Sequence, residues 1–406
     1  MRKFSLMEEW KEYKARDFCS GVTDGTHDSP KPTNEGYYLI TSKHLKDNLI
    51  DFSSANLISE EDYLKVITRS TVEQYDILFS MIGTIGNVVQ VRLRNVDFAV
   101  KNMGIFKMGR NELKSSWLYY WLKSNCAKEY INQRLAGSTQ SYLTLESLRE
   151  FPLYYPGDKL ADQIISVLKS LDDKIEVNRQ INDNLQHQAQ AQYKSWFVDF
   201  EPFGDDEFTE TEFGIVPKEW KILSFEDFIV ALTEKAPVDS LPEYSVTNNG
   251  IIPRDTKFNK KLSKSSSMNK VLRKDNLVFG MSREILNWGI MEDEIGGVSS
   301  AYNIYKIDED LVNPTYLRLY MKTKIAEFNS LIGTAAREGQ SLDKGQLMQK
   351  KIYVPSKNIL QDFFAHYCPI METIHNSDQE SRRLAQLRDT LLPRLMSGEL
   401  KVSDID

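Results

Sequence analysis

Two polar loops of the sequence hold the kinds of side chain that read the edges of nucleic-acid bases. Arginine, lysine, amide and hydroxyl groups hydrogen-bond to base edges in a groove, while further basic groups bind phosphates. The loop from Gly137 to Tyr142 contains Ser138, Thr139, Gln140 and Ser141, and Arg134 lies just before it. Its counterpart, from Gly333 to Ser341, offers Arg337 and Gln340. The two loops lie at equivalent positions in two similar halves of the chain. We therefore expect both loops to contact DNA or to lie close to it.

A third loop, from Thr23 to Thr33, contains one glycine and two prolines and is therefore predicted to be a defined turn. The candidate contacts in this loop are His27, Lys31 and Thr33. In the alternative interpretation, the Asp24–His27 segment only satisfies the hydrogen bonds of its own turn, and Lys31 remains the better candidate.

The second half of the chain also carries a basic run. The candidate phosphate or base contacts in this half are Lys257, Lys260, Lys261, Lys264 and Arg283. A run of like charges is often only a solvated face, and the sequence leaves this alternative open.

Motifs for catalysis are missing from the sequence. An adenine methyltransferase needs an Asn/Asp-Pro-Pro-aromatic motif, yet no Pro-Pro pair occurs, and no phosphate-binding loop ends in Gly-Lys-Ser/Thr. The five histidines are scattered, and no Cys-x-x-Cys pair suggests a metal site. We therefore expect a non-catalytic chain that binds no cofactor of its own.

Length and composition favour two domains of a soluble protein. The chain has 406 residues, of which 41% are hydrophobic and 27% charged. Three widely spaced cysteines, no long apolar run and no signal peptide predict a cytoplasmic protein without a membrane span. The net charge of −7 equals the charge of the acidic stretch Asp199–Glu212, which contains no basic residue. The rest of the chain is balanced, so a basic DNA-binding face is still compatible with the composition.

The sequence is internally duplicated. Glu9-Trp10-Lys11 recurs as Glu219-Trp220-Lys221, and farther along Asp76-Ile77-Leu78 is matched to Asp275-Asn276-Leu277. Each half is predicted to mix strands, such as 37–40 and 77–82, with helices at 113–132 and 314–331. The fold class expected is therefore α+β, with two similar globular domains related by a pseudo-two-fold axis.

Each half ends in a long segment with apolar residues spaced by three and four positions. The segments begin near Leu160 and Ile359, and each predicts a helix of about 35 residues, roughly 50 Å long. Polar residues such as Asn178 and Asn182 interrupt the first stripe. Pairing the two stripes in an antiparallel, coiled-coil-like spacer would bury both. Pro369 is expected to kink the second helix or break it.

The predicted boundaries follow from these patterns. Residues 1–156 and 215–355 form the two globular domains, 157–198 and 356–398 the two helices, 199–214 an acidic linker, and 399–406 a tail.

Several segments resemble the specificity subunits of type I restriction-modification enzymes. The central and C-terminal shared regions of that family resemble YKSWFVDFEPF (193–203) and LLPRLMSGEL (391–400). Its recognition domains resemble DGTHDSP (24–30), DILFSMIGTIG (76–86) and GIVPKEW (214–220). The resemblance covers nearly the whole chain, although the second half lacks a DGTH-like segment.

The resemblance implies a subunit that reads a bipartite, asymmetric target in double-stranded DNA. It also implies docking of two methyltransferase subunits and of restriction/translocase subunits, with S-adenosylmethionine, ATP and Mg²⁺ bound by those partners. The expected docking residues are Trp196, Phe197, Phe200, Phe203, Leu391, Leu392 and Leu395. The competing hypothesis is a coiled-coil adaptor with two protein-binding modules, which salt-sensitive DNA binding would exclude.

Overall fold

The computed structural model describes residues 10–46, 48–136, 141–204, 207–236, 241–254, 269–282, 284–333 and 341–404. The chain forms two compact units. Unit 1 consists of Met1–Asp183 and His375–Asp406, and unit 2 consists of Asn184–Ile374. Each unit therefore contains one sheet-bearing region and one half of each long helix.

The sheet of unit 1 has four antiparallel strands in the order β2-β10-β7-β8. The strands are β2 (Gly21–Asp24), β7 (Ile77–Ser80), β8 (Val88–Gln90) and β10 (Met103–Lys107). β7 and β8 are buried along their whole length, because other layers cover both faces of the sheet.

Smaller elements complete unit 1. A three-stranded sheet has the order β6-β3-β9, where β3 (Tyr37–Ile40) and β9 (Phe98–Val100) are parallel. β6 (Asn56–Ile58) precedes α2 (Glu60–Ser70), whose first turn is capped by the Ser59 side chain. Two further strands, β4 (Leu45–Lys46) and β5 (Leu49–Ile50), form a hairpin, and β1 (Lys11–Lys14) pairs with β11 (Pro152–Tyr155).

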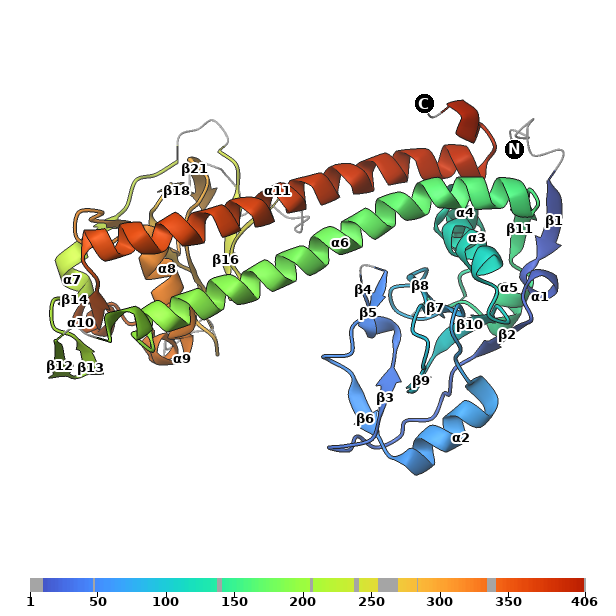
Figure 1. The fold of residues 1–406 in the computed structure, drawn as a ribbon, viewed down its shortest axis with the longest axis horizontal. Coiled ribbons are helices and arrows are strands. Elements are labelled where there is room, and N and C mark those ends of the chain that lie inside the picture. The colour runs from blue at the N-terminus through green and yellow to red at the C-terminus, as the bar shows by residue number, and fades with distance from the viewer. Residues whose placement is uncertain are drawn as a thin grey trace. The chain divides into compact units, whose positions relative to one another are not determined.

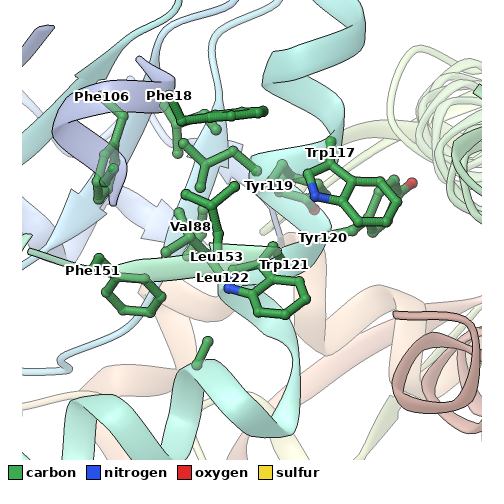
Figure 2. Packing of buried hydrophobic residues seen from close by; sticks show 14 of the residues in the cluster. Phe18, Val88, Phe106, Trp117, Tyr119, Tyr120, Trp121, Leu122, Phe151 and Leu153 are labelled. Atoms are coloured by element: carbon green, nitrogen blue, oxygen red, sulfur yellow. The ribbon is translucent and has the colours of Figure 1, made fainter. Parts of the chain in front are cut away.

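The core of unit 1 is built on α3 (Glu112–Lys123), which is buried from Ser115 to Leu122. Two indole N–H groups on this helix donate to backbone oxygens of β11, each at 2.9 Å: Trp117 to Tyr154 and Trp121 to Pro152. Figure 2 shows these two rings among the neighbouring apolar side chains. Buried Trp therefore satisfies its only polar group while filling the core.

The helix predicted at 113–132 is divided in two. α3 ends before Ser124, and α4 (Asn125–Gln133) begins after it, because the Ser124 hydroxyl accepts from the Ala127 N–H as an N-cap. Two short helices, α1 (Ala15–Phe18) and α5 (Leu145–Arg149), complete the unit.

Unit 2 repeats the sheet order of unit 1 as β15-β22-β19-β20. The strands are β15 (Ile229–Leu232), β19 (Leu277–Phe279), β20 (Trp288–Ile290) and β22 (Asn303–Ile307). The pair β14 (Lys221–Ser224) and β25 (Lys351–Val354) repeats the pair β1 and β11. The helices are α7 (Phe225–Phe228), α8 (Pro314–Thr323), α9 (Ile325–Phe328) and α10 (Lys344–Gln349).

Unit 2 also carries strand pairs outside this shared plan. They are β12 (Phe208–Thr211) with β13 (Gly214–Pro217), β16 (Tyr244–Thr247) with β17 (Gly250–Pro253), and β18 (Lys270–Arg273) with β21 (Ile295–Val298). A fourth pair, β23 (Ile332–Gly333) with β24 (Ser341–Leu342), corresponds to the antiparallel bridge between Ala136 and Tyr142 in unit 1. The two units thus share a framework and differ in what is added to it.

The structure corrects one detail of the duplication. Asp76 corresponds to Asn276 and not to Asp275. The side chains of Asp76 and Asn276 each accept a hydrogen bond from the backbone N–H three residues earlier, at 2.8 and 3.1 Å. Each also follows a residue with left-handed backbone, Tyr75 (φ 69°) and Asp275 (φ 60°). The matched letters Asp-Ile-Leu and Asp-Asn-Leu are therefore one residue out of structural register.

The two long helices are α6 (Asp158–Phe197) and α11 (Lys357–Met396), drawn in green and orange-red in Figure 1. Each has 40 residues, and their ends lie within two residues of the predicted bounds. α11 continues through Pro369, so the predicted break is wrong. Proline removes one backbone donor, and both Pro369 and Ala365, whose carbonyl loses that donor, are exposed to water.

The helices pair antiparallel. In unit 1 the beginning of α6 and the end of α11 share one core, with Leu168 and Leu395 fully buried. In unit 2 the end of α6 meets the beginning of α11, where the Phe197 and Phe363 rings are 4.7 Å apart. Residue numbers therefore rise along one helix as they fall along the other, as predicted.

Polar contacts lie between the helices in unit 1. Buried Asn178 donates to Glu380 Oε2, and buried Asn182 donates to Asp378 Oδ1, each at 2.7 Å. Buried amides stay in such a seam only when they find partners. The expected polar interruption of the apolar stripe is confirmed.

A buried polar cluster also joins α3 to both long helices in unit 1. The Arg388 guanidinium of α11 lies 2.6 Å from Asp172 of α6, and the Tyr120 hydroxyl of α3 donates to the same carboxylate at 2.9 Å. Burial lowers the pKa of Lys123, at the end of α3, to about 8.

The α+β class, the duplication and the helical pair expected from the sequence are all present. No helix in the described part of the chain is long and apolar enough to cross a membrane.

Candidate functional site

One end of the four-stranded sheet of unit 1 gathers several segments of the chain. β2 ends at Asp24 beside Gly104, near the start of β10, and β7 ends at Ser80 beside Met103. β8 starts opposite Phe79, close to the end of β7. Because neighbouring strands are antiparallel, residues 25–33, 81–87 and 101–102 all leave the sheet at this end.

The polar loop after α4 reaches the same end. The Leu143 N–H donates to the Met81 carbonyl at 2.9 Å, and Tyr142 forms a β-bridge with Ile82. Two loops that are far apart in the sequence are therefore neighbours in the fold. We call residues 25–33, 81–87, 101–102, 134–136 and 141–143 together the loop end of unit 1.

Arg134 and Ser141 are exposed at the loop end. The guanidinium carbon of Arg134 lies 3.8 Å from the centroid of the Tyr130 ring, an arrangement that stacks the cation on the aromatic face and leaves its donors free to turn outward. The other predicted contacts of this loop, Ser138, Thr139 and Gln140, lie outside the described residues. Arg134 and Ser141 thus remain predicted contacts at a position suited to them.

His27 and Thr33 make local contacts, and for His27 the alternative interpretation of the loop expects this. The two ring nitrogens of His27 lie 3.0 Å from Asp24 Oδ2 and 2.9 Å from Asn102 Oδ1. Thr33 donates its hydroxyl proton to a backbone carbonyl two residues later, at 2.7 Å. Lys31 is exposed and forms no ion pair within the described part of unit 1, so it remains the freest candidate of the loop.

Sequence reasoning missed three polar residues beside this loop. Lys101 and Asn102 form the turn before β10, and the Lys101 N–H donates to the Ile40 carbonyl at the end of β3. Lys43, three residues beyond that strand, is exposed. The available signal was a lysine soon after each of two short apolar strands, whose parallel pairing brings their ends together.

Unit 2 has the equivalent end. β15 ends beside Ile304, and β19 ends between Asn303 and Trp288, so residues 280–282, 284–287 and 299–302 leave the sheet there. The predicted contacts of this half fall outside the described residues: Lys257, Lys260, Lys261, Lys264, Arg283, Arg337 and Gln340. Their placement is left as a prediction.

The basic residues that directly follow that run have partners within the unit. Lys270 donates to the Tyr302 carbonyl at 2.7 Å, and burial lowers the pKa of its ammonium. Arg273 and Lys274 each form an ion pair with a glutamate, at 2.7 and 3.0 Å. Lys270 is half-buried, and the exposed Arg273 and Lys274 are paired within the unit.

Most of the expected docking residues are packed inside the protein. The buried members are Phe197, Phe203, Leu392 and Leu395, and the half-buried members are Trp196, Phe200 and Leu391. Phe197 and Leu395 are 0% exposed, so neither has area to offer a partner. These side chains are buried because each unit packs around one end of the helical pair. The docking prediction now rests on the three half-buried side chains.

Within the described ranges, no group of three or more His, Cys, Asp or Glu side chains is arranged to hold a metal ion. The loop ends instead offer donors and acceptors at a surface, which is an arrangement for recognition by hydrogen bonding.

Comparisons with known proteins agree with this geometry. The family model described as "Type I restriction modification DNA specificity domain" matches residues 7–187. The chain is 26% identical over 303 residues to the type I restriction enzyme MjaIX specificity subunit of Methanocaldococcus jannaschii, covering 72% of this chain and 70% of that protein. It is 25% identical to the HindI specificity subunit of Haemophilus influenzae, covering 97% of this chain and 100% of that protein.

One solved structure shares the fold. It is the S subunit of the type I restriction-modification system from M. genitalium, with a TM-score of 0.51 and 14% sequence identity. The match covers 95% of this chain and 96% of the other. At this identity the likeness concerns the fold alone.

Proposed function

We propose that this chain, which belongs to the family of type I restriction-modification specificity subunits, recognises a DNA sequence in two parts, with one part read by each unit. The chain contributes recognition and assembly and does no chemistry. The protein-adaptor hypothesis is not favoured, because both named relatives and the matching family model point to DNA specificity.

The repeated sheet order carries this proposal. The same four-stranded arrangement occurs once in each unit and directs its connecting segments to one end of the sheet. Two readers that share a framework but differ in their loops are expected to read two different half-sites. An asymmetric target with an unread gap between its halves follows from this design.

Partner subunits would supply the chemistry. Methyltransferase subunits would bring S-adenosylmethionine, and restriction/translocase subunits would bring ATP and Mg²⁺. In this chain, the half-buried Trp196, Phe200 and Leu391 are the proposed contacts for them. Partly exposed aromatic residues are enriched where protein surfaces meet.

A methylation map tests the function directly. The chain is co-expressed with its cognate methyltransferase subunit in a host without other adenine methylation, and N6-methyladenine is located by long-read sequencing. We expect one asymmetric motif in two parts with a fixed gap, and no such motif when either subunit is expressed alone. Absence of modification with a methyltransferase shown to bind the chain would contradict the proposal.

A further inference from the structure

A chain of polar contacts crosses the loop end of unit 1. Arg69 of α2 lies 2.9 Å from Asp24 Oδ1, and Asp24 Oδ2 lies 3.0 Å from His27 Nε2. His27 Nδ1 lies 2.9 Å from Asn102 Oδ1. Asp24 is 5% exposed, whereas the His27 side chain is 61% exposed. The series therefore begins at a buried carboxylate and ends at a surface carboxamide.

His27 is unsuited to reading a base itself. An imidazole has two polar atoms, and here both face oxygen atoms of the same unit. What the ring does in this arrangement is to hold the Asn102 side chain.

Asn102 keeps hydrogen-bonding capacity that His27 lacks. Its Oδ1 has a second lone pair, and its Nδ2 has no partner within the described residues. Its backbone is left-handed (φ 54°), a conformation that asparagine tolerates better than most residues. The turn is anchored as well, since the Asn102 N–H donates to the Thr26 carbonyl at 3.1 Å.

We propose that Asn102 is a base-reading residue of unit 1 and that His27 is its positioning residue. This inference rests on the proposed function and adds to it which residue of unit 1 reads a base and which base it reads. A carboxamide can pair with adenine in the major groove, where Oδ1 accepts from the N6 amino group and Nδ2 donates to N7. The base pair read by Asn102 is therefore A·T.

Neighbouring side chains support a site for nucleic acid at this position. Lys101 precedes Asn102 and donates to the hydroxyl of Ser29, which lies in the same loop as His27. Lys31, in the same loop, is exposed. Basic groups beside a base-reading amide are the arrangement expected when phosphate contacts fix the position of the reader.

The experiment is the methylation map described above, repeated with variants. Asn102→Gly removes the carboxamide but accepts the left-handed backbone, and Asn102→Asp keeps the shape but replaces the donor by an acceptor. With either variant we expect discrimination at one A·T pair of one half-site to fall by roughly 5- to 150-fold, the range for loss of a bidentate contact. The other half-site and the gap should not change.

Two further variants separate reading from folding. Asn48→Gly is the matched control, because Asn48 also has positive φ (66°) in a turn of unit 1. It is exposed where Asn102 is half-buried, and it contacts Lys123 instead of His27. It should leave the motif unchanged. His27→Ala should relax the same base pair as Asn102→Gly, to a smaller extent. A merely structural role would lower methylation at all sites without changing base preference.

Three outcomes would overturn the inference: an unchanged motif in both Asn102 variants, relaxation at a G·C pair, or equal relaxation in Asn48→Gly. A wild-type chain that yields no motif would instead contradict the proposed function, so the two failures are distinguishable.

Discussion

Replacing Phe197 by alanine should destabilise the lone chain, before any partner is present. The side chain is fully buried in unit 2, and its ring centroid lies 4.7 Å from that of Phe363, 5.3 Å from Tyr316 and 5.8 Å from Trp220. Truncation removes most of this packing and leaves a cavity among rings that cannot collapse freely. A buried Phe→Ala change costs about 3–5 kcal/mol.

The loss should appear as a lower melting temperature of unit 2. For a unit of this size, each kcal/mol lowers the melting temperature by about 2–4 °C, so we expect a decrease of roughly 6–20 °C. Hydrogen exchange followed by mass spectrometry assigns the change, because peptides of α8 should lose protection while peptides of α3 keep theirs.

The control is Phe208→Ala, since Phe208 lies in the same unit but is 37% exposed. It should change stability by less than about 1 kcal/mol. If Phe197→Ala left the stability of the lone chain unchanged and only weakened binding of a partner subunit, the assignment of Phe197 to the core would be wrong. The docking role expected from the sequence would then be restored.

Two electrostatic predictions concern the polar cluster of unit 1. Lys123→Met should stabilise the protein by about 1–2 kcal/mol below pH 8, because burial lowers the pKa of this lysine to about 8 and disfavours its charged form. Loss of the hydrogen bonds to Tyr119 and Asn48 offsets part of the gain. The stability advantage of the variant should disappear as the pH rises from 8 to 10.5, because the folded wild type releases this proton in that range. Urea titrations across the range check this prediction, and an advantage that grew with pH would contradict the reasoning. Asp172→Asn should cost about 2–4 kcal/mol in urea unfolding, because Arg388 is then left in a buried site with Asp389 as its only carboxylate partner. Asp389→Asn, whose carboxylate is 64% exposed, should cost far less, and equal losses would show that burial does not govern the pair.

The sequence predicted much of the framework. The spacing of apolar residues gave two long helices whose observed bounds, Asp158–Phe197 and Lys357–Met396, lie close to the expected ones. It did so because helical periodicity over 40 residues is a strong signal, and a strong stripe of this kind outweighed the prolines at positions 369 and 393.

Local patterns were less reliable where one hydrogen bond decides the outcome. A continuous helix was expected over 113–132, but the Ser124 hydroxyl caps a new helix within that span. Asp76 was paired with Asp275 on identity of letters, whereas the shared hydrogen bond pairs it with Asn276. Such offsets of one residue are invisible without the geometry of the turn.

The candidate site divides in the same way. The residue types in the loops at 24–33 and 134–142 already indicated recognition by hydrogen bonds, because polar side chains on Gly- and Pro-containing turns are exposed and available. Only the tertiary structure placed residues 25–33 and the two described ends of the second loop, 134–136 and 141–142, at one end of a sheet. Antiparallel pairing of segments distant in sequence decides which turns become neighbours. Only the tertiary structure distinguished His27, with both ring nitrogens occupied, from Asn102, and buried Phe197 from half-buried Trp196. Residue type is a property of the chain, but exposure and partnership depend on everything that packs around a side chain.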